Sequence, residues 1–300
     1  MTRSFSMIWA VSPLFALAAP MLSAPAAAQD VATFYKSTEV APGIYMLEGG
    51  DGFGGGNVGL LAGEDHVALI DDGLAPTAGT LLAGIEKIVG RPVDFIINTH
   101  VHGDHAGGNA HFAAEGAVIF AHDNIRKRLV ANPESAGGAE GLPVVTFADG
   151  VTFHLNGIEA RVHHFASAHT DGDSYVVFPE ANVIQTGDLF FNGSFPFIDL
   201  DSGGSVSGYL EAQRELLELA DAETVLVPGH GPLATRAELE THLAMLIDSH
   251  AKVQALVDDG LSADEVVAAN PLAGYHEEYD WPFITTERMT RTLYRDIAGE

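Results

Sequence analysis

The sequence has 300 residues, no cysteine, and 41 acidic residues against 14 lysines and arginines, for a formal net charge of −27. A chain this acidic repels phosphate backbones, which argues against nucleic acid as a partner. The absence of thiols excludes disulfides and limits any metal site to nitrogen and oxygen ligands. The length is sufficient for one large domain or two small ones, each with its own core.

The first segment has the pattern of a cleaved signal peptide. A positively charged start is followed by a short apolar run at 7–19 and by three alanines at 26–28, the small residues typical of a cleavage site. A membrane anchor is the alternative, but the run is too short to span a bilayer and contains Pro13. We therefore expect a signal peptide over 1–28, one mature domain over 29–300, a periplasmic or secreted location, and no membrane span.

Short apolar segments separated by turn residues predict a mixed α/β chain. The predicted strands lie at 43–47, 58–62, 66–70, 93–98, 117–120, 144–147, 151–155, 159–165, 175–178, 182–186 and 224–227. Helices are predicted at 77–89, 123–130 and 206–220, with a mostly helical tail from about residue 236. Asn156-Gly157 between two strands indicates a hairpin. This order predicts two αβ halves packed sheet against sheet with helices outside, a four-layer αββα sandwich.

Three histidines and an aspartate lie within six residues, directly after one predicted strand. The motif reads His100-Val101-His102-Gly103-Asp104-His105. Alternate residues of an extended chain point the same way, so His100 and His102 can face one metal. Asp104 and His105, after an expected turn at Gly103, can face a second. Imidazole and carboxylate suit zinc, and also iron or manganese. Four ligand-type residues at this spacing argue against the alternative, a solvated histidine-rich loop.

Three further ligand-type residues follow later strands, each within three residues of a glycine that lets the backbone come close to a site. They are His169, Asp188 and His230. Each alone is compatible with a polar loop, but together they predict additional metal ligands. His163 and His164 compete with His169, which we prefer because it lies past the end of its strand. The other histidines are expected at the surface or in the core: His66, His111, His122, His154, His242, His250 and His276.

The order His-x-His-x-Asp-His, then His, then Gly-Asp, then Gly-His-Gly resembles the metallo-β-lactamase superfamily of binuclear hydrolases, over roughly residues 40–235. The resemblance implies the αββα fold of that superfamily and two metal ions, expected to be Zn²⁺ with iron or manganese left open. It implies seven ligands: His100, His102 and His169 on the first metal, Asp104, His105 and His230 on the second, and Asp188 bridging them. Asp71 matches the family's strand-end aspartate, which supports the ligands from behind.

Two divalent cations imply hydrolysis by a hydroxide that bridges them and attacks a carbonyl. Asp104 would orient this nucleophile and return a proton. Asn192, four residues after Asp188, is a candidate donor to the oxyanion, and the alternative is a turn residue before Gly193. Both Asp104 and Asn192 are therefore candidate catalytic residues.

A glycine-rich segment at 49–56 contains one aromatic residue, Phe53. One interpretation is a flexible flap that presents Phe53 to the substrate, which resembles the mobile hairpin of β-lactamases in the superfamily. The other is a slack surface loop. Four phenylalanines are candidates for an apolar pocket wall or for the core: Phe190, Phe191, Phe195 and Phe197.

The sequence leaves the substrate class open. The β-lactamases that this layout resembles carry Cys or Ser where Asp188 stands, and many carry Lys where Phe191 stands. Aspartate there is typical of the superfamily's thioesterases and lactonases. We expect an exported, β-lactamase-like zinc hydrolase that acts on a small cyclic amide or ester. The alternatives are a lactonase or thioesterase with only promiscuous β-lactam activity, and a metal-binding protein without turnover. No oligomeric state is predicted.

Overall fold

Two β-sheets face each other across a shared apolar layer in the computed structural model, which describes residue 1 and residues 35–50 and 55–299. The predicted signal peptide and Phe53 lie outside the described residues. The described residues from 35 onward belong to one compact unit. No helix in the described part of the chain has the length and apolar character needed to cross a membrane.

The first sheet contains seven strands in chain order. They are β1 (Tyr35–Ala41), β2 (Ile44–Gly49), β3 (Val58–Ala62), β4 (Val67–Ile70), β5 (Phe95–Ile97), β6 (Val118–His122) and β7 (Val145–Phe147). Strands β1 to β4 pair antiparallel, and β4 to β7 pair parallel. The parallel strands therefore share one carboxyl edge, where β5 leads into the histidine motif.

The second sheet contains five strands in the order β12-β11-β10-β9-β8. They are β8 (Gly150–Leu155), β9 (Ile158–His164), β10 (Ser174–Phe178), β11 (Val183–Phe191) and β12 (Val225–His230). Its neighbours pair antiparallel except β11 and β12, which pair parallel.

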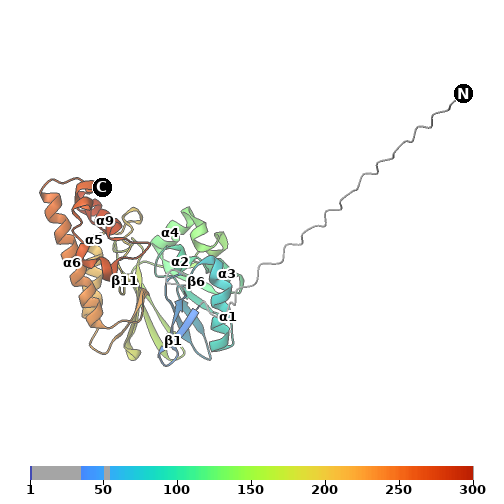
Figure 1. The fold of residues 1–300 in the computed structure, drawn as a ribbon. Helices are drawn as coiled ribbons and strands as arrows, with labels where there is room; N and C mark the ends of the chain where they lie inside the picture. The colour runs from blue at the N-terminus through green and yellow to red at the C-terminus, as the bar shows by residue number, and fades with distance from the viewer. Residues whose placement is uncertain (2–34, 51–54, 300) are drawn as a thin grey trace. The chain divides into compact units, whose positions relative to one another are not determined.

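Helices cover the outer face of each sheet, as Figure 1 shows. They are α1 (Ala78–Val89), α2 (Gly103–Ala106), α3 (Asn109–Ala114), α4 (Asp123–Ala131), α5 (Val206–Leu219), α6 (Arg236–Asp258), α7 (Ala263–Ala269), α8 (His276–Tyr279) and α9 (Thr286–Ala298). Helices α1 and α3 lie outside the first sheet, and α5, α6 and α9 outside the second. This arrangement confirms the predicted four-layer αββα sandwich.

Three apolar layers hold the sandwich together. Buried residues such as Ile70 and Phe153 fill the space between the sheets. Leu81 of α1 packs on the outer face of the first sheet, and Leu216 of α5 packs on that of the second. Each fully buried aliphatic or aromatic side chain stabilises the fold by roughly 1.5–3 kcal/mol. The sandwich therefore has a core on both sides of each sheet.

The Asn156-Gly157 hairpin is confirmed, and it also ties the two sheets together. Both residues have positive φ, 56° and 77°, and Leu155 pairs with Ile158 across the turn. The Asn156 Oδ1 accepts hydrogen bonds from the backbone N–H groups of Asp65 and His66, and its Nδ2 donates to the His66 carbonyl. A turn in the second sheet thus satisfies the backbone of a turn in the first.

Two local predictions were wrong, and one strand was missed. The strand predicted at 182–186 continues to Phe191, because all nine residues of β11 are buried, so Asp188 lies inside a strand rather than beyond its end. The turn expected at Gly103 is the start of helix α2, preceded by His102. Strand β1 was not predicted, because this edge strand is mostly polar and partly exposed and lacks the apolar alternation that marks a strand.

Candidate metal centre

All seven ligand-type side chains named from the motifs converge at one place. Three groups have ligand atoms within 4.8 Å of one another: His100, His102, His169 and Asp188; His100, Asp104 and His105; and His105, Asp188 and His230. His100, His105 and Asp188 each belong to two groups. The structure therefore offers two adjacent positions for a cation, with shared ligands between them.

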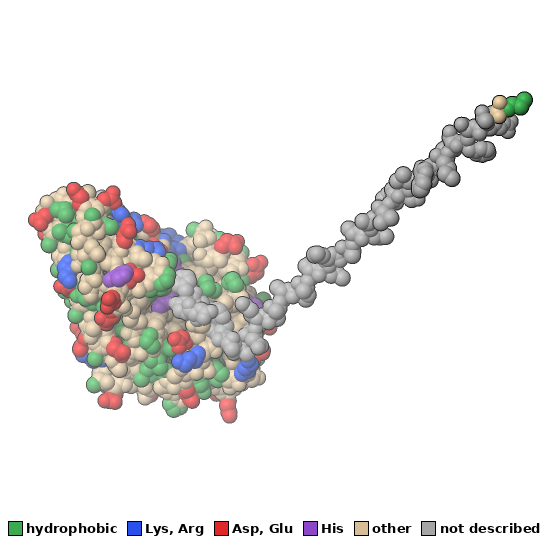
Figure 2. Space-filling model, viewed as in Figure 1, with side chains coloured by type: hydrophobic (Ala, Val, Ile, Leu, Met, Phe, Trp, Pro, Cys, Tyr) green, Lys and Arg blue, Asp and Glu red, His purple; other side chains and the backbone are tan. Residues whose placement is uncertain are grey.

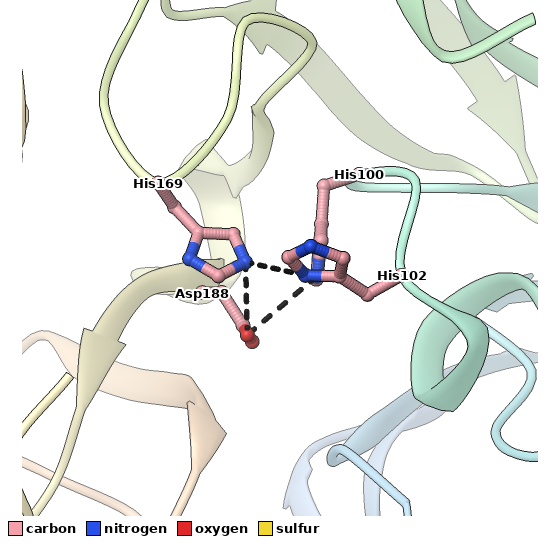
Figure 3. A group of neighbouring side chains, drawn as sticks. All are labelled: His100, His102, His169 and Asp188. Carbon is pink, nitrogen blue, oxygen red and sulfur yellow. Dashed lines mark hydrogen bonds and ion pairs between the residues drawn. The ribbon is translucent and has the colours of Figure 1, made fainter. Parts of the chain in front are cut away.

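The first position lies among the side chains drawn in Figure 3. The His169 Nε2 is 2.8 Å from the His102 Nδ1 and 3.3 Å from the Asp188 Oδ2. The same carboxylate oxygen is 3.6 Å from the His100 Nε2. Three imidazoles from two distant segments thus turn a nitrogen toward one carboxylate.

Each of these imidazoles is held from behind. The His102 Nε2 donates to the Asp199 Oδ2 at 2.9 Å, and the His169 Nδ1 donates to the Phe197 carbonyl at 2.6 Å. The His100 Nδ1 lies 3.0 Å from the Thr99 hydroxyl. When the rear nitrogen carries the proton, the lone pair of the other nitrogen faces the centre, which is the tautomer a metal requires.

The second position lies between His105, Asp104 and His230. The His230 Nε2 is 3.4 Å from both the His105 Nε2 and the Asp104 Oδ2. The His105 Nε2 is also 3.1 Å from the Asp188 Oδ1 and 3.7 Å from the Asp104 Oδ2. Asp188 therefore reaches both positions with its two oxygens.

Asp71 supports both positions from the end of β4. Its Oδ2 accepts from the His105 Nδ1 at 2.8 Å and from the Thr99 hydroxyl at 2.7 Å, while its Oδ1 accepts from the Thr99 N–H at 2.7 Å. Thr99 in turn contacts His100. The φ of Asp71 is 64°, a left-handed conformation that a short polar side chain tolerates better than most. One buried carboxylate thereby orients one ligand of each position.

Two glycines let the backbone pass close to the ligands. A Cβ on Gly56 would lie 2.2 Å from the His105 ring, and a Cβ on Gly229 would lie 2.0 Å from the Asp188 Oδ1. No larger residue fits at either position without displacing a ligand. The glycine that precedes His230 in the sequence thus makes room for Asp188 across the sheet.

The carboxylates and histidines of the centre shift one another's pKa values. Burial opposes ionisation of Asp188, but the surrounding histidines, above all His105 and His230, hold the pKa of this carboxyl well below its ordinary value. Burial would lower the pKa of His230, but Asp188 and Asp104 raise it to about 9. Burial lowers the pKa of His169 to about 4. The carboxylates and histidines of the centre therefore shift one another's pKa values in opposite directions, toward an ionised Asp188 and a protonated His230.

Two buried atoms of the centre fit a cation. The His100 Nε2 and the Asp188 Oδ1 have no hydrogen-bond partner within the described ranges. A buried polar atom without a partner is destabilising, and a divalent cation satisfies both a lone pair of nitrogen and a carboxylate oxygen. The donor set of imidazole and carboxylate suits zinc, iron and manganese.

A pocket of about 200 Å³ opens over the ligands. Four ligand-type residues form its floor: His102, Asp104, Asp188 and His230. Four aromatic residues form its walls: Phe191, Phe197, Trp281 and Phe283. The Phe191 ring is nearly parallel to that of His230, with centroids 4.8 Å apart. Of the four phenylalanines left open by the sequence, Phe191 and Phe197 are wall residues, whereas Phe190 and Phe195 are buried in the core.

Asn192 is not brought into this pocket. Its Nδ2 donates to the carbonyls of Pro232 and Leu233, at 3.1 and 3.4 Å, and Gly193 has a φ of 78°. These are the contacts of the turn residue considered as the alternative, because the amide is engaged with the loop after β12. We therefore assign no oxyanion contact to Asn192.

The competing histidines lie elsewhere. The His163 ring stacks on Tyr175 with centroids 5.2 Å apart, and His164 stacks on His122 at 3.5 Å. Both stand on β9, whereas His169 lies in the loop beyond it. The sequence analysis did not identify Asp199, Trp281 or Phe283 as site residues. Trp281 and Phe283 could have been noticed as an aromatic pair on either side of Pro282. No sequence motif marks Asp199.

Comparison with known proteins gives one consistent result. The family model of the metallo-beta-lactamase superfamily matches residues 51–230. An acyl-coenzyme A thioesterase, MBLAC2 of Gallus gallus, is 28% identical over 202 residues, 58% of this chain and 72% of the thioesterase. A hydroxyacylglutathione hydrolase of Rhodospirillum rubrum is 31% identical over 166 residues, 54% of this chain and 56% of the hydrolase.

The fold is similarly matched among solved structures. A metallo-beta-lactamase from Pontibacter korlensis superposes with a TM-score of 0.63 at 21% identity, covering 71% of this chain and 99% of the lactamase. At this identity the likeness concerns the fold. The family match over residues 51–230 includes all seven ligand-type residues.

Proposed function

This chain belongs to the metallo-β-lactamase superfamily of metal-dependent hydrolases, and from that premise we propose an exported enzyme that holds two zinc ions and hydrolyses a small cyclic amide or ester. The observation that carries the proposal is the pocket itself. Its floor consists of four of the seven ligand-type side chains, and its walls are aromatic. A carbonyl compound that enters this pocket meets the ligands directly.

The chain's own residues divide the work. Two cations held there would lower the pKa of a bound water toward about 7 and polarise a carbonyl oxygen. Asp188 would hold the spacing between them, because its Oδ1 lies near His105 and its Oδ2 near both His169 and His230. Asp104 lines the pocket beside His230, so its carboxylate is placed to orient the attacking water and to pass its proton to the leaving group. The aromatic walls would exclude bulk water from the acyl group.

One observation favours a second candidate, a lactonase or thioesterase with only incidental β-lactam activity. Phe191 stands flat against His230 in the pocket wall, and the described lining residues include no lysine or arginine. Such walls suit an acyl chain. The similarity to a protein named as an acyl-coenzyme A thioesterase and to a hydroxyacylglutathione hydrolase points the same way. An open pocket above a complete ligand set argues against a metal-binding protein without turnover.

Export is the remaining part of the proposal, and the leader pattern of residues 1–28 supports it. Expression of the full chain in a bacterium, followed by fractionation and N-terminal sequencing, tests it. Recovery in the periplasm of a chain that starts near residue 29 is expected. A cytoplasmic chain that keeps residue 1 would contradict it.

The function is tested with the purified chain from residue 29, with two equivalents of zinc and after chelation. A chromogenic cephalosporin, a lactone and a thioester are assayed side by side, and bound metal is counted by mass spectrometry. Chelator-sensitive turnover of the cephalosporin supports the first candidate, and turnover of only the lactone or thioester supports the second. A protein with two metals and no turnover of any of the three would contradict both.

The role of Asp104 has its own control. Asp104→Asn keeps the size of the side chain but removes its charge and its capacity to accept a proton. We expect this variant to retain metal while losing turnover. Unchanged turnover would exclude the role given to Asp104.

A further inference from the structure

Arg288 lies beside the pocket, and the described residues show it no acidic partner. Arg288 is in the first turn of α9, and its guanidinium carbon is 4.3 Å from the centre of the Phe283 ring and 5.0 Å from that of Phe197. Both rings line the pocket. The Arg288 Nη1 donates to the Phe283 carbonyl at 2.8 Å. Stacking and one hydrogen bond thus fix an exposed cation next to the aromatic walls.

The other arginines of this helix are neutralised. Arg291 pairs with Glu287 and Asp264, both at 3.0 Å, and Arg295 pairs with Asp201 at 2.8 Å. For Arg288 no ion pair is found among residues 35–50 and 55–299. The same helix therefore carries two arginines with structural partners and one whose charge is available.

The first turn of α9 is an unfavourable position for the charge of Arg288. The first turn of a helix disfavours positive charge, because the helix dipole is itself positive there. The chain has 41 acidic residues, and Figure 2 shows acidic side chains scattered over the visible face. Despite this excess of carboxylates, Arg288 is directed onto two pocket rings.

Phe197 connects this cation to the metal centre. Its ring centre is 5.4 Å from that of His102 and 5.8 Å from that of His169. Arg288 is therefore one ring away from two ligands of the first metal position. A small substrate with its carbonyl over the ligands can extend along the Phe197 wall to the guanidinium.

We propose that Arg288 binds a carboxylate carried by the substrate and so makes the enzyme selective for anionic acyl compounds. A guanidinium pairs with a carboxylate through two parallel hydrogen bonds, and the Arg288 donors not used on Phe283 are available for this. The inference rests on the proposed hydrolase function and deepens it, since it names a charged feature of the substrate that the pocket lining alone does not select.

The test compares two esters that differ by one carboxylate, p-nitrophenyl butyrate and the p-nitrophenyl half-ester of succinate. Four zinc-loaded proteins are assayed: wild type, Arg288→Gln, Arg288→Lys and Arg291→Gln. For Arg288→Gln we expect the KM of the half-ester to rise about tenfold, the effect of losing one charge-assisted pair, with kcat and the butyrate kinetics nearly unchanged. Arg288→Lys should recover part of the loss, and Arg291→Gln, the matched control, should behave as wild type.

Two results would overturn the inference. If Arg288→Gln weakens both esters equally, the arginine only supports the aromatic wall. If it changes neither ester, its charge does not reach the substrate.

A binding experiment tests the inference even if neither ester is hydrolysed, an outcome that would count against the proposed function on esters alone. The sequence has two tryptophans, Trp9 and Trp281, so a chain that starts at residue 29 reports only from the pocket wall. Fluorescence titration with phenylacetate and with neutral phenylacetamide should show tighter binding of phenylacetate to wild type and loss of that preference in Arg288→Gln. A preference that survives the substitution would refute the role of Arg288.

Discussion

The two halves of the sandwich supply the candidate metal centre in different ways. The first half contributes four ligands from one short stretch after β5, from His100 to His105, so their spacing is set by the local backbone. The second half contributes His169, Asp188 and His230 from three separate segments, which meet only because β11 pairs with β12 and because the loop after β9 folds over them. One half of the centre is therefore local, and the other depends on tertiary structure.

The supporting residues cross between the halves. Asp71, at the end of a strand of the first sheet, orients His105, whereas Asp199, from the loop that follows β11, orients His102 across the interface. Neither half holds its ligands in place alone. Substitutions at the centre and at its supports test this division, and their expected effects decrease from Asp188 to Asn156.

Removing the shared carboxylate should have the largest effect. Asp188→Ala takes a ligand from both positions and leaves several histidines without their central partner. We expect loss of both metals at micromolar zinc and a fall in turnover of more than about 100-fold, beyond the range typical for a residue that only supports a ligand. Metal counting checks this, with Asp149→Asn, an exposed aspartate, as the control. Two metals retained at wild-type affinity would contradict the shared role.

The second-largest effect is expected on stability, which should fall when a buried histidine outside the centre becomes protonated. His242 of α6 is buried between Gln213 and the Ser194 carbonyl, and burial lowers its pKa to about 4. The unfolded chain, with a histidine pKa of about 6.5, binds more protons between pH 6.5 and 4, so stability falls as pH falls through this window.

The contribution of His242 reaches about 3 kcal/mol at the acid end of the window, from the size of the pKa shift. The measurement is urea unfolding of the metal-free protein at several pH values, compared with His242→Gln. The difference in unfolding free energy between the two proteins should shrink by that amount from pH 7 to pH 4. A difference independent of pH would show that His242 has the same pKa in the folded and the unfolded chain.

Asp71→Asn and Asp199→Asn weaken one supporting contact on each side of the interface. Substitutions of this kind typically cost 10–100-fold in metal affinity, about 1.4–2.7 kcal/mol. Asp71 should show the larger loss, because it is fully buried and accepts three hydrogen bonds from His105 and Thr99, whereas Asp199 is partly exposed. Competition with a fluorescent zinc chelator measures both. A larger loss for Asp199 would mean that His102 anchors the centre more than His105 does.

The smallest effect is expected far from the ligands. Asn156→Gly keeps the left-handed turn but removes the side chain that bonds to Asp65 and His66, and Asn156→Ala also introduces strain at a φ of 56°. We expect about 1–2 kcal/mol of destabilisation for Gly and more for Ala, with two metals still bound. Thermal unfolding ranks the pair. A loss of metal in either variant would show that sheet docking controls the centre.

The local half of the centre was accessible to sequence reasoning, and the dispersed half was accessible only in part. The spacing from His100 to His105 follows from an extended strand end, although the helix at Gly103 was not anticipated. Which of Phe190 and Phe191 lines the pocket was not predictable, because β11 is buried on both faces and shows no alternation of polar and apolar residues. Asp199 carries no motif, since its role comes from a contact with a residue 97 positions away.

The division of ligands also makes this chain a candidate for reconstitution from fragments. The first sheet ends at Phe147 and the second begins at Gly150, with exposed residues between them. A cut at this junction leaves one fragment with Asp71 and four ligands and another with three ligands and the pocket aromatics. Because neither fragment contains a complete centre, recovery of bound metal on mixing would measure how tightly the two sheets associate.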